Sequence, residues 1–133
     1  METVGIGIIG LGMRGLQTLG RTIATLEHET GFRVTAINDR NPERMVEARE
    51  LLAQMFASKG IEADPRLYRD GEALIAAPEV DLVLITSITD SHRQYAVPAL
   101  RSGKKVYCDK PLAQNAEDAV TIVEAEAAAR KRR

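Results

Sequence analysis

The chain has 133 residues, of which 44% are hydrophobic and 28% charged, and these values predict one globular domain that is too short to hold two cores. The 18 basic and 19 acidic side chains give a formal net charge of -1, which argues against a nucleic-acid binder because such proteins cluster Lys and Arg. No apolar run approaches the roughly 18 residues that cross a bilayer, and the N-terminus lacks the features of a cleaved signal, so we expect a cytoplasmic domain without membrane contact.

In the first half of the chain, strand-like runs of apolar residues alternate with segments of helical periodicity. The pattern predicts, in order, a buried strand over Val4 to Ile9, a helix from Met13 to about Leu26, a strand over Phe32 to Ile37, a helix from Pro42 to Lys59-Gly60 with Asn41 as its N-cap, and a short edge strand at Leu67-Tyr68. Each helix is long enough to carry the chain back across a sheet.

The second half continues this alternation. It predicts a short helix over Glu72 to Ala77, a central strand over Val80 to Thr86, a helix that Asp90 or Ser91 caps and Pro98 bends before it ends at Ser102-Gly103, a strand over Lys105 to Cys108, and a helix from Asn115 that packs through Ala119, Ile122, Val123 and Ala127. Strands joined through helices form parallel sheets with right-handed connections. We therefore predict an α/β doubly wound parallel sheet (Rossmann fold) in the order 3-2-1-4-5, with room for one more edge strand.

The most specific motif of the first half is Gly10-Leu11-Gly12-Met13-Arg14-Gly15, which fits G-x-G-x-x-G between a predicted strand and a predicted helix. Here Gly10 would allow the tight turn, Gly12 a close approach of the backbone to a pyrophosphate, and Gly15 the packing of helix on strand. The N-H groups of residues 11 to 14 and the helix dipole then favour an anion. We interpret this turn as a dinucleotide site, with an ordinary strand-to-helix turn as the alternative.

An acidic residue follows the second predicted strand at the position where such sites hold the adenosine ribose. Asp39 lies 24 residues after Gly15, and a carboxylate there accepts hydrogen bonds from ribose hydroxyls and repels a 2′-phosphate. Arg40 comes next and could bind such a phosphate. The pair favours NAD over NADP, while a strand-end turn residue and a solvated arginine remain the alternatives.

The carboxyl ends of the fourth and fifth predicted strands meet at the switch point of the sheet, where ligands bind. The residues there resemble the Gfo/Idh/MocA (glucose-fructose oxidoreductase and inositol dehydrogenase) family, and the resemblance covers essentially the whole chain. It includes Gly5 to Gly12, Asp39 with Arg44 and Ala48, and Val80-Asp81. Its most specific part is the block Ala99 to Ala113, which is similar to the family's "AL.aGKhV.cEKPla".

The resemblance implies that Lys110, the lysine of the family's EKP motif, lies near the nicotinamide and the reacting carbon. A cation there can stabilise the oxygen that gains charge during hydride transfer. Asp109, where the family usually has Glu, would orient this lysine or contact the cofactor ribose. Ser87 keeps the hydroxyl of the family's Thr-Pro pair, and His92 either contacts the cofactor or only hydrogen-bonds its own loop.

Members of this family carry a second, C-terminal domain with the substrate pocket and usually the oligomer interface. We therefore expect residues 1–133 to be an NAD(P)-binding Rossmann domain alone, without that domain, from an oxidoreductase that transfers a hydride between a nicotinamide cofactor and a sugar, polyol or related hydroxy compound. Such a domain would be inactive in isolation, and its exposed faces could form a homo-oligomer. The alternative is a stand-alone module that senses a dinucleotide or binds a protein without catalysis.

Two further expectations concern cysteine and metal. Cys108 is the single cysteine, so it cannot form an internal disulfide, and at the end of a buried strand we expect it to be a small core residue and not a nucleophile. No Cys and His residues have the spacing of a structural zinc site, so we expect no metal. An S-adenosylmethionine site is disfavoured by the block around Lys110.

Overall fold

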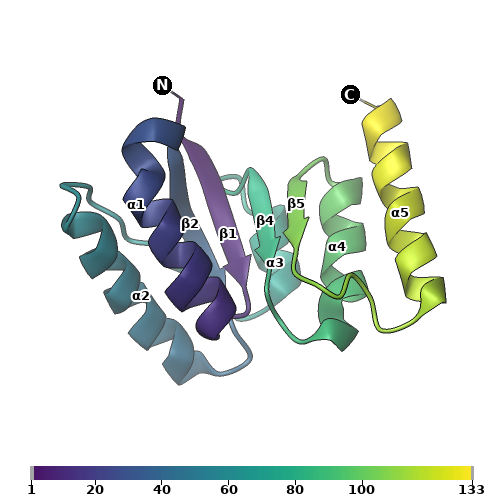
Figure 1. Ribbon diagram of the computed structural model, residues 1–133, viewed down its shortest axis with the longest axis horizontal. Coiled ribbons are helices and arrows are strands. Elements are labelled where there is room, and N and C mark those ends of the chain that lie inside the picture. The colour runs from purple at the N-terminus through teal and green to yellow at the C-terminus, as the bar shows by residue number, and fades with distance from the viewer. Residues whose placement is uncertain (1, 133) are drawn as a thin grey trace.

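The computed structural model describes residues 2–132, which form a parallel sheet in the predicted order, β3-β2-β1-β4-β5 (Figure 1). Its strands are β1 (Val4–Ile9), β2 (Phe32–Asn38), β3 (Arg66–Leu67), β4 (Leu82–Ile85) and β5 (Lys105–Cys108). All four strand pairs are parallel, and β3 and β5 form the two edges. Among residues 2–132 no sixth strand joins the sheet.

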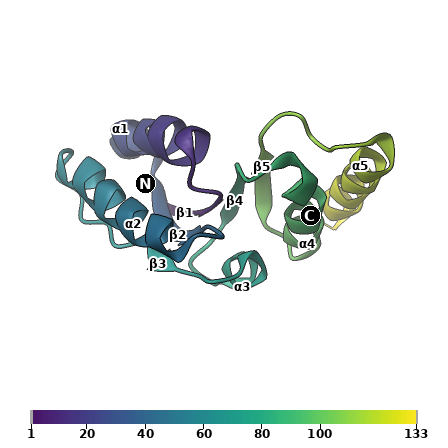
Figure 2. The same cartoon turned by 90° about the horizontal axis from the view of Figure 1, so that it is seen from below.

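The helices connect these strands as the sequence predicts. They are η1 (Met13–Gly20), a π-helical segment that continues directly as α1 (Arg21–Thr30), then α2 (Pro42–Ala57), α3 (Gly71–Ala76), the 3-10 turn η2 (Thr89–Ser91), α4 (His92–Arg101) and α5 (Ala116–Lys131). Figure 2 shows α1 and α3 on opposite sides of the sheet and α5 outermost, beyond α4. No helix among residues 2–132 is long and apolar enough to cross a membrane.

The hydrophobic core is divided between the two faces of the sheet. One cluster contains Leu52 and Phe56 of α2 and Ala24 of α1, packed on Ile6 and Ile8 of β1. The other contains buried residues of α3, α4 and α5. Because both faces of the central strands are covered, β1 and β4 are apolar along their whole length, which is the signal that identifies them in the sequence.

The predicted cap at Asn41 is confirmed, and Asn115, where the last helix is predicted to begin, caps α5 in the same way. The side chain of Asn41 accepts a hydrogen bond from the amide of Glu43, and that of Asn115 accepts one from the amide of Asp118. Of the two residues predicted to cap α4, Ser91 occupies the N-cap position, but its side chain makes no capping hydrogen bond. The η2 turn precedes α4 instead, and the Ser91 hydroxyl donates to the carbonyl of Ile88 at 2.6 Å.

The predicted packing face of the last helix also needs a correction. α5 buries Ile122, Ala125 and Ala129, whereas Val123 is 57% exposed. The helix packs on α4 at the margin of the molecule and not on the sheet (Figure 1), so its buried stripe is narrow. β5 is likewise only half covered, and Cys108 is half-buried against the core instead of ending a buried strand.

Candidate functional site

The glycine-rich turn lies between β1 and η1, and two of its glycines are required by close contacts. Gly10 has φ +96°, and a Cβ atom there would lie 2.5 Å from the backbone nitrogen of Ser87. A Cβ atom on Gly15 would collide with the hydroxyl of Thr86 and the carbonyl of Gly10. Both contacts hold the turn against the residues that follow β4, as the motif predicts for a tight turn and for close helix packing.

The middle glycine has a different environment. Gly12 has an extended backbone, with φ -82° and ψ -163°, and a Cβ atom there would meet nothing within 4 Å. Neither strain nor protein packing therefore explains a glycine at this position. It opens instead into a cavity, where a methyl group would occupy the space that a closely approaching ligand needs.

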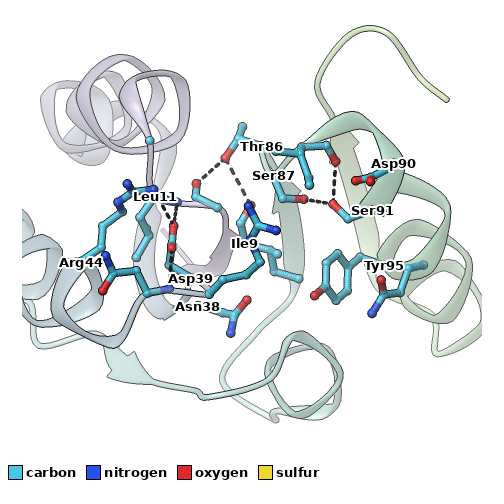
Figure 3. A pocket seen from close by; sticks show the side chains of 16 residues that line it. Ile9, Leu11, Asn38, Asp39, Arg44, Thr86, Ser87, Asp90, Ser91 and Tyr95 are labelled. Atoms are coloured by element: carbon cyan, nitrogen blue, oxygen red, sulfur yellow. Dashed lines mark hydrogen bonds and ion pairs between the residues drawn. The ribbon is translucent and has the colours of Figure 1, made fainter. Parts of the chain in front are cut away.

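Asp39 joins this turn to the end of β2 (Figure 3). Its carboxylate accepts a hydrogen bond from the amide of Leu11 at 2.8 Å and one from the amide of Asn41 at 2.9 Å, and it lies 3.6 Å from the guanidinium of Arg44. The side chain is only 8% exposed. The expectation that the amides of residues 11 to 14 are all free for an anion is therefore wrong for Leu11, because Asp39 uses that amide.

Three amides of the turn remain close to the start of the helix. Those of Gly12, Met13 and Arg14 lie at a helix N-terminus, where the first N-H groups have no acceptor one turn earlier. The helix dipole adds partial positive charge at the same place. This end of the helix can hold a negatively charged group between the turn and the open space above Gly12.

A cavity of about 730 Å³ extends from the turn across the carboxyl ends of the strands. Figure 3 shows its walls, which come from Gly10 to Gly12 on one side, Asn38 to Asn41 below, and residues 86–88, 90, 91, 94 and 95 on the other. Arg40 lines it and is exposed, as is Arg44 from the first turn of α2. The volume and its place at the switch point suit an elongated ligand such as a dinucleotide.

The loop after β4 forms the far wall of this cavity. Thr86 donates a hydrogen bond to the carbonyl of Gly10 at 2.7 Å, which ties β4 to the turn. Ser87 keeps its hydroxyl within 2.6 Å of that of Ser91, so the predicted site residue is held by a partner in its own loop (Figure 3). Thr86 ends the fourth predicted strand at the switch point, so its place in the site is predicted from the sequence. The roles of Arg44 and Tyr95 are not predicted, although Arg44 is part of the family resemblance.

A second cavity, of about 720 Å³, lies beside the end of β5 and is lined by Arg14, Tyr107, Cys108, Asp109 and Lys110. Arg14 reaches across from the glycine-rich turn, with its Nε 3.4 Å from Asp109 and its Nη2 donating to the Tyr107 hydroxyl at 3.2 Å. The hydrogen bond to Tyr107 and the neighbouring carboxylate of Asp109 raise the pKa of Arg14. The second cavity is therefore connected to the turn through a charged side chain.

Lys110 is exposed on the rim of this second cavity. Within residues 2–132 no carboxylate lies within 4 Å of its ammonium group, and Asp109 pairs with Arg14. Of the two roles expected for Asp109, orienting Lys110 is therefore wrong, because this carboxylate pairs with Arg14 at the start of the helix. Contact with the cofactor ribose stays a prediction. The neighbouring Cys108 thiol is half-buried, and burial raises its pKa to about 11, which keeps it protonated and unreactive near neutral pH.

His92 occupies the space between the loops that follow β4 and β5. It is 1% exposed, with Nε2 3.1 Å from the carbonyl of Ser87 and Nδ1 3.0 Å from that of Pro111. Of the two roles that the sequence leaves open, the geometry favours hydrogen bonding to the loops, since both ring nitrogens already face backbone carbonyls.

Comparisons with known proteins agree with this geometry. Residues 4–132 match the Gfo/Idh/MocA family model, described as "Oxidoreductase family, NAD-binding Rossmann fold". The chain is 39% identical over 130 residues to inositol 2-dehydrogenase of Burkholderia cenocepacia (strain HI2424), an alignment that covers 98% of this chain and 35% of that protein. Against inositol 2-dehydrogenase of Pseudomonas fluorescens (strain Pf-5) it is 39% identical over 127 residues, which is 96% of the chain and 34% of the relative.

Solved structures show the same relationship. An NAD binding oxidoreductase from Klebsiella pneumoniae superposes with a TM-score of 0.71 at 30% identity, over 96% of this chain and 32% of that one. The myo-inositol dehydrogenase from Lactobacillus casei, in complex with NAD(H) and myo-inositol, has a TM-score of 0.71 at 28% identity, over 95% and 34%. The chain thus spans about a third of the length of the relatives that it matches. It belongs to the Gfo/Idh/MocA oxidoreductase family and corresponds to the NAD-binding Rossmann domain of that family.

Proposed function

We propose that this domain holds NAD for an oxidoreductase that interconverts a polyol or sugar and its keto form. The observation that carries the proposal is Gly12, a glycine with ordinary backbone angles and empty space where its side chain would be. When bound, the nicotinamide ring supplies the chemistry by accepting or donating a hydride. The residues of this chain bind the dinucleotide, orient it and stabilise charge next to it.

The pyrophosphate is proposed to lie over Gly12, against the amides of Gly12, Met13 and Arg14. These donors and the helix dipole are fixed before the ligand arrives, so binding a phosphate there needs little rearrangement. The guanidinium of Arg14, which is half exposed and lines the second cavity, adds positive charge near the start of the helix.

Asp39 is proposed to bind the adenosine ribose. A carboxylate offers about four acceptor positions, and the amides of Leu11 and Asn41 use two of them. The remaining positions can accept hydrogen bonds from ribose hydroxyls. The 2′-phosphate of NADP would meet this nearly buried negative charge, which favours NAD over NADP. The positive charges of Arg40 and Arg44 on the same cavity reduce the difference in affinity between the two cofactors.

Lys110 is proposed as the catalytic residue that this domain contributes. Its ammonium group has no carboxylate partner among the described residues and lines the second cavity. There it can donate a hydrogen bond to the substrate oxygen, which gains negative charge as a hydride adds to the carbonyl carbon and carries the same charge as an alkoxide before the hydride leaves in the reverse direction. Being exposed, Lys110 needs a covering surface that excludes water and positions the substrate. We propose that the rest of the parent protein supplies this surface, along with the contacts of a homo-oligomer, and that the 133-residue chain alone binds NAD but turns over little substrate.

Calorimetric titration of the chain with NADH, NADPH and S-adenosylmethionine tests this function. We expect saturable, one-to-one binding of NADH, weaker binding of NADPH and none of S-adenosylmethionine. Failure of NADH to bind at millimolar concentration, or a preference for S-adenosylmethionine, would refute the proposal. Incubation with NAD and myo-inositol is a second assay, and reduction of NAD at an ordinary dehydrogenase rate would contradict the proposed dependence on a further domain.

A further inference from the structure

The segment that carries Lys110 follows β5, and only one backbone hydrogen bond continues the sheet beyond the end of that strand. The amide of Asp109 donates to the carbonyl of Ile85 at 2.9 Å, which extends the pairing of β5 with β4 by one residue. From Lys110 to the cap of α5, the backbone of the segment makes hydrogen bonds only with the ring of His92 among the described residues. Nδ1 of this ring lies 3.0 Å from the carbonyl of Pro111 and 3.3 Å from that of Leu112.

The opposite side of the same ring contacts the other loop. Nε2 of His92 lies 3.1 Å from the carbonyl of Ser87, a residue that lines the cavity proposed for the dinucleotide. The ring is 1% exposed, so an apolar side chain in its place would leave the buried carbonyls that it contacts without this partner. A neutral imidazole carries one N-H, so it donates a hydrogen bond to one of these loops and packs closely against the other. One buried side chain thus joins the loop after β4 to the segment after β5.

We propose that His92 is a positioning residue that fixes the Lys110 segment against the loop after β4, and thereby forms the wall on which the nicotinamide half of the dinucleotide rests. The inference rests on the proposed function, because it assumes that the dinucleotide extends from the first cavity to Lys110. His92 makes no contact with the cofactor itself in this arrangement. Its effect reaches the nicotinamide half through Lys110, while the adenosine half depends on the turn and on Asp39.

The separation between the two halves of the dinucleotide gives a test that needs no catalytic activity. ADP-ribose contains the adenosine and pyrophosphate parts of NAD without the nicotinamide, so the ratio of its Kd to that of NADH reports how much the nicotinamide end contributes. We expect His92→Leu to weaken NADH about ten-fold, as the loss of a hydrogen-bonded partner would, and to leave ADP-ribose within about two-fold of wild type. The fluorescence of bound NADH should move toward that of free NADH, because the nicotinamide ring no longer rests against a fixed wall.

The control is His28→Leu, which removes the other histidine of the chain. His28 is exposed near the end of α1, contacts the carbonyl of Lys59 and lines neither cavity, so neither affinity should change. If His92→Leu weakens ADP-ribose as much as NADH, or changes neither, the positioning role is wrong. If wild type binds ADP-ribose but gains nothing from the nicotinamide, this inference fails and the adenosine site stands. If wild type binds neither ligand, the proposed function fails as well.

Two conservative variants keep the test decisive should the leucine variant not fold. In His92→Asn the new side-chain amide nitrogen can take the place of Nδ1 and donate to the carbonyl of Pro111, whereas in His92→Gln it takes the place of Nε2 and faces Ser87. We expect His92→Asn to restore most of the NADH affinity and His92→Gln to restore less. Equal NADH affinities in these two variants would overturn the proposal.

Discussion

Replacement of Gly12 by alanine should separate ligand binding from folding. The backbone of Gly12, at φ -82° and ψ -163°, suits any residue, and the added methyl group meets no protein atom within 4 Å. The free energy of unfolding should therefore stay within about 0.5 kcal/mol of wild type, or rise by about 0.4 to 1 kcal/mol because alanine restricts the unfolded chain.

The same methyl group stands where the proposed pyrophosphate would contact the turn. Forcing an extra carbon into a close-packed contact costs about 1 to 3 kcal/mol. At 25 °C this corresponds to a Kd for NADH that is about 5- to 160-fold higher. Calorimetric titration gives the Kd, and urea denaturation of the same samples gives the free energy of unfolding.

Gly15→Ala is the matched control, because it makes the same chemical change three residues later. Its methyl group would collide with the carbonyl of Gly10 and the hydroxyl of Thr86, so the free energy of unfolding should fall by about 1 to 3 kcal/mol. If Gly12→Ala binds NADH as wild type does, the open space above Gly12 is not the dinucleotide site. If it unfolds as easily as Gly15→Ala, the description of that space is wrong.

Three further changes probe separate parts of the structure. Asp39→Ala leaves two backbone amides without an acceptor, so the free energy of unfolding should fall by about 1 to 3 kcal/mol. The affinity for NADH should fall as well, and a variant that binds NADH with wild-type affinity would show that Asp39 is not part of the site. Cys108 should react slowly with iodoacetamide at pH 8, and the reaction rate, measured by mass spectrometry, should rise about ten-fold per pH unit up to about pH 11. Rapid labelling at pH 7 would contradict the burial of the thiol. The hydrogen bond from the Tyr68 hydroxyl lowers the pKa of Glu79, so the stability that this carboxylate contributes is present above pH 4.5 and lost as the pH falls. The unfolding free energies of wild type and Glu79→Gln should thus converge in acid, and a difference that is constant from pH 7 to pH 3 would count against this contact.

The fold could be predicted from the sequence because its signals are local. Apolar runs such as Val4 to Ile9 identify strands that are covered on both faces, and Asn41 and Asn115 cap helices through their own neighbours. The parallel strand order follows from the alternation of strands and helices and from the handedness of their connections. The glycine-rich turn was equally visible, since its spacing and its place after a strand are both in the sequence.

The contacts that define the site join residues far apart in the chain, so they could not be predicted from local sequence patterns. That Asp39 uses the amide of Leu11, and that Asp109 pairs with Arg14 and not with Lys110, follow only from how the turn and the strand ends meet. The same holds for the contact of His92 with the carbonyl of Pro111, which lies 19 residues away in the chain. The sequence predicts that Val123 packs against the domain, whereas it is exposed. Periodicity identifies the apolar stripe of a helix but not the neighbouring element that buries each residue of that stripe.

Mapping the amide signals of the labelled chain by NMR during titration with NADH tests most directly whether the dinucleotide lies on the glycine-rich turn. The predicted result is that the largest shifts fall on Gly10 to Gly15 and on Asp39, followed by Ser87 and Asp109-Lys110 at the nicotinamide end. Shifts confined to another surface, such as the apolar groove between β5 and α5 near Val123, or no shifts at saturating NADH, would contradict the proposed binding mode.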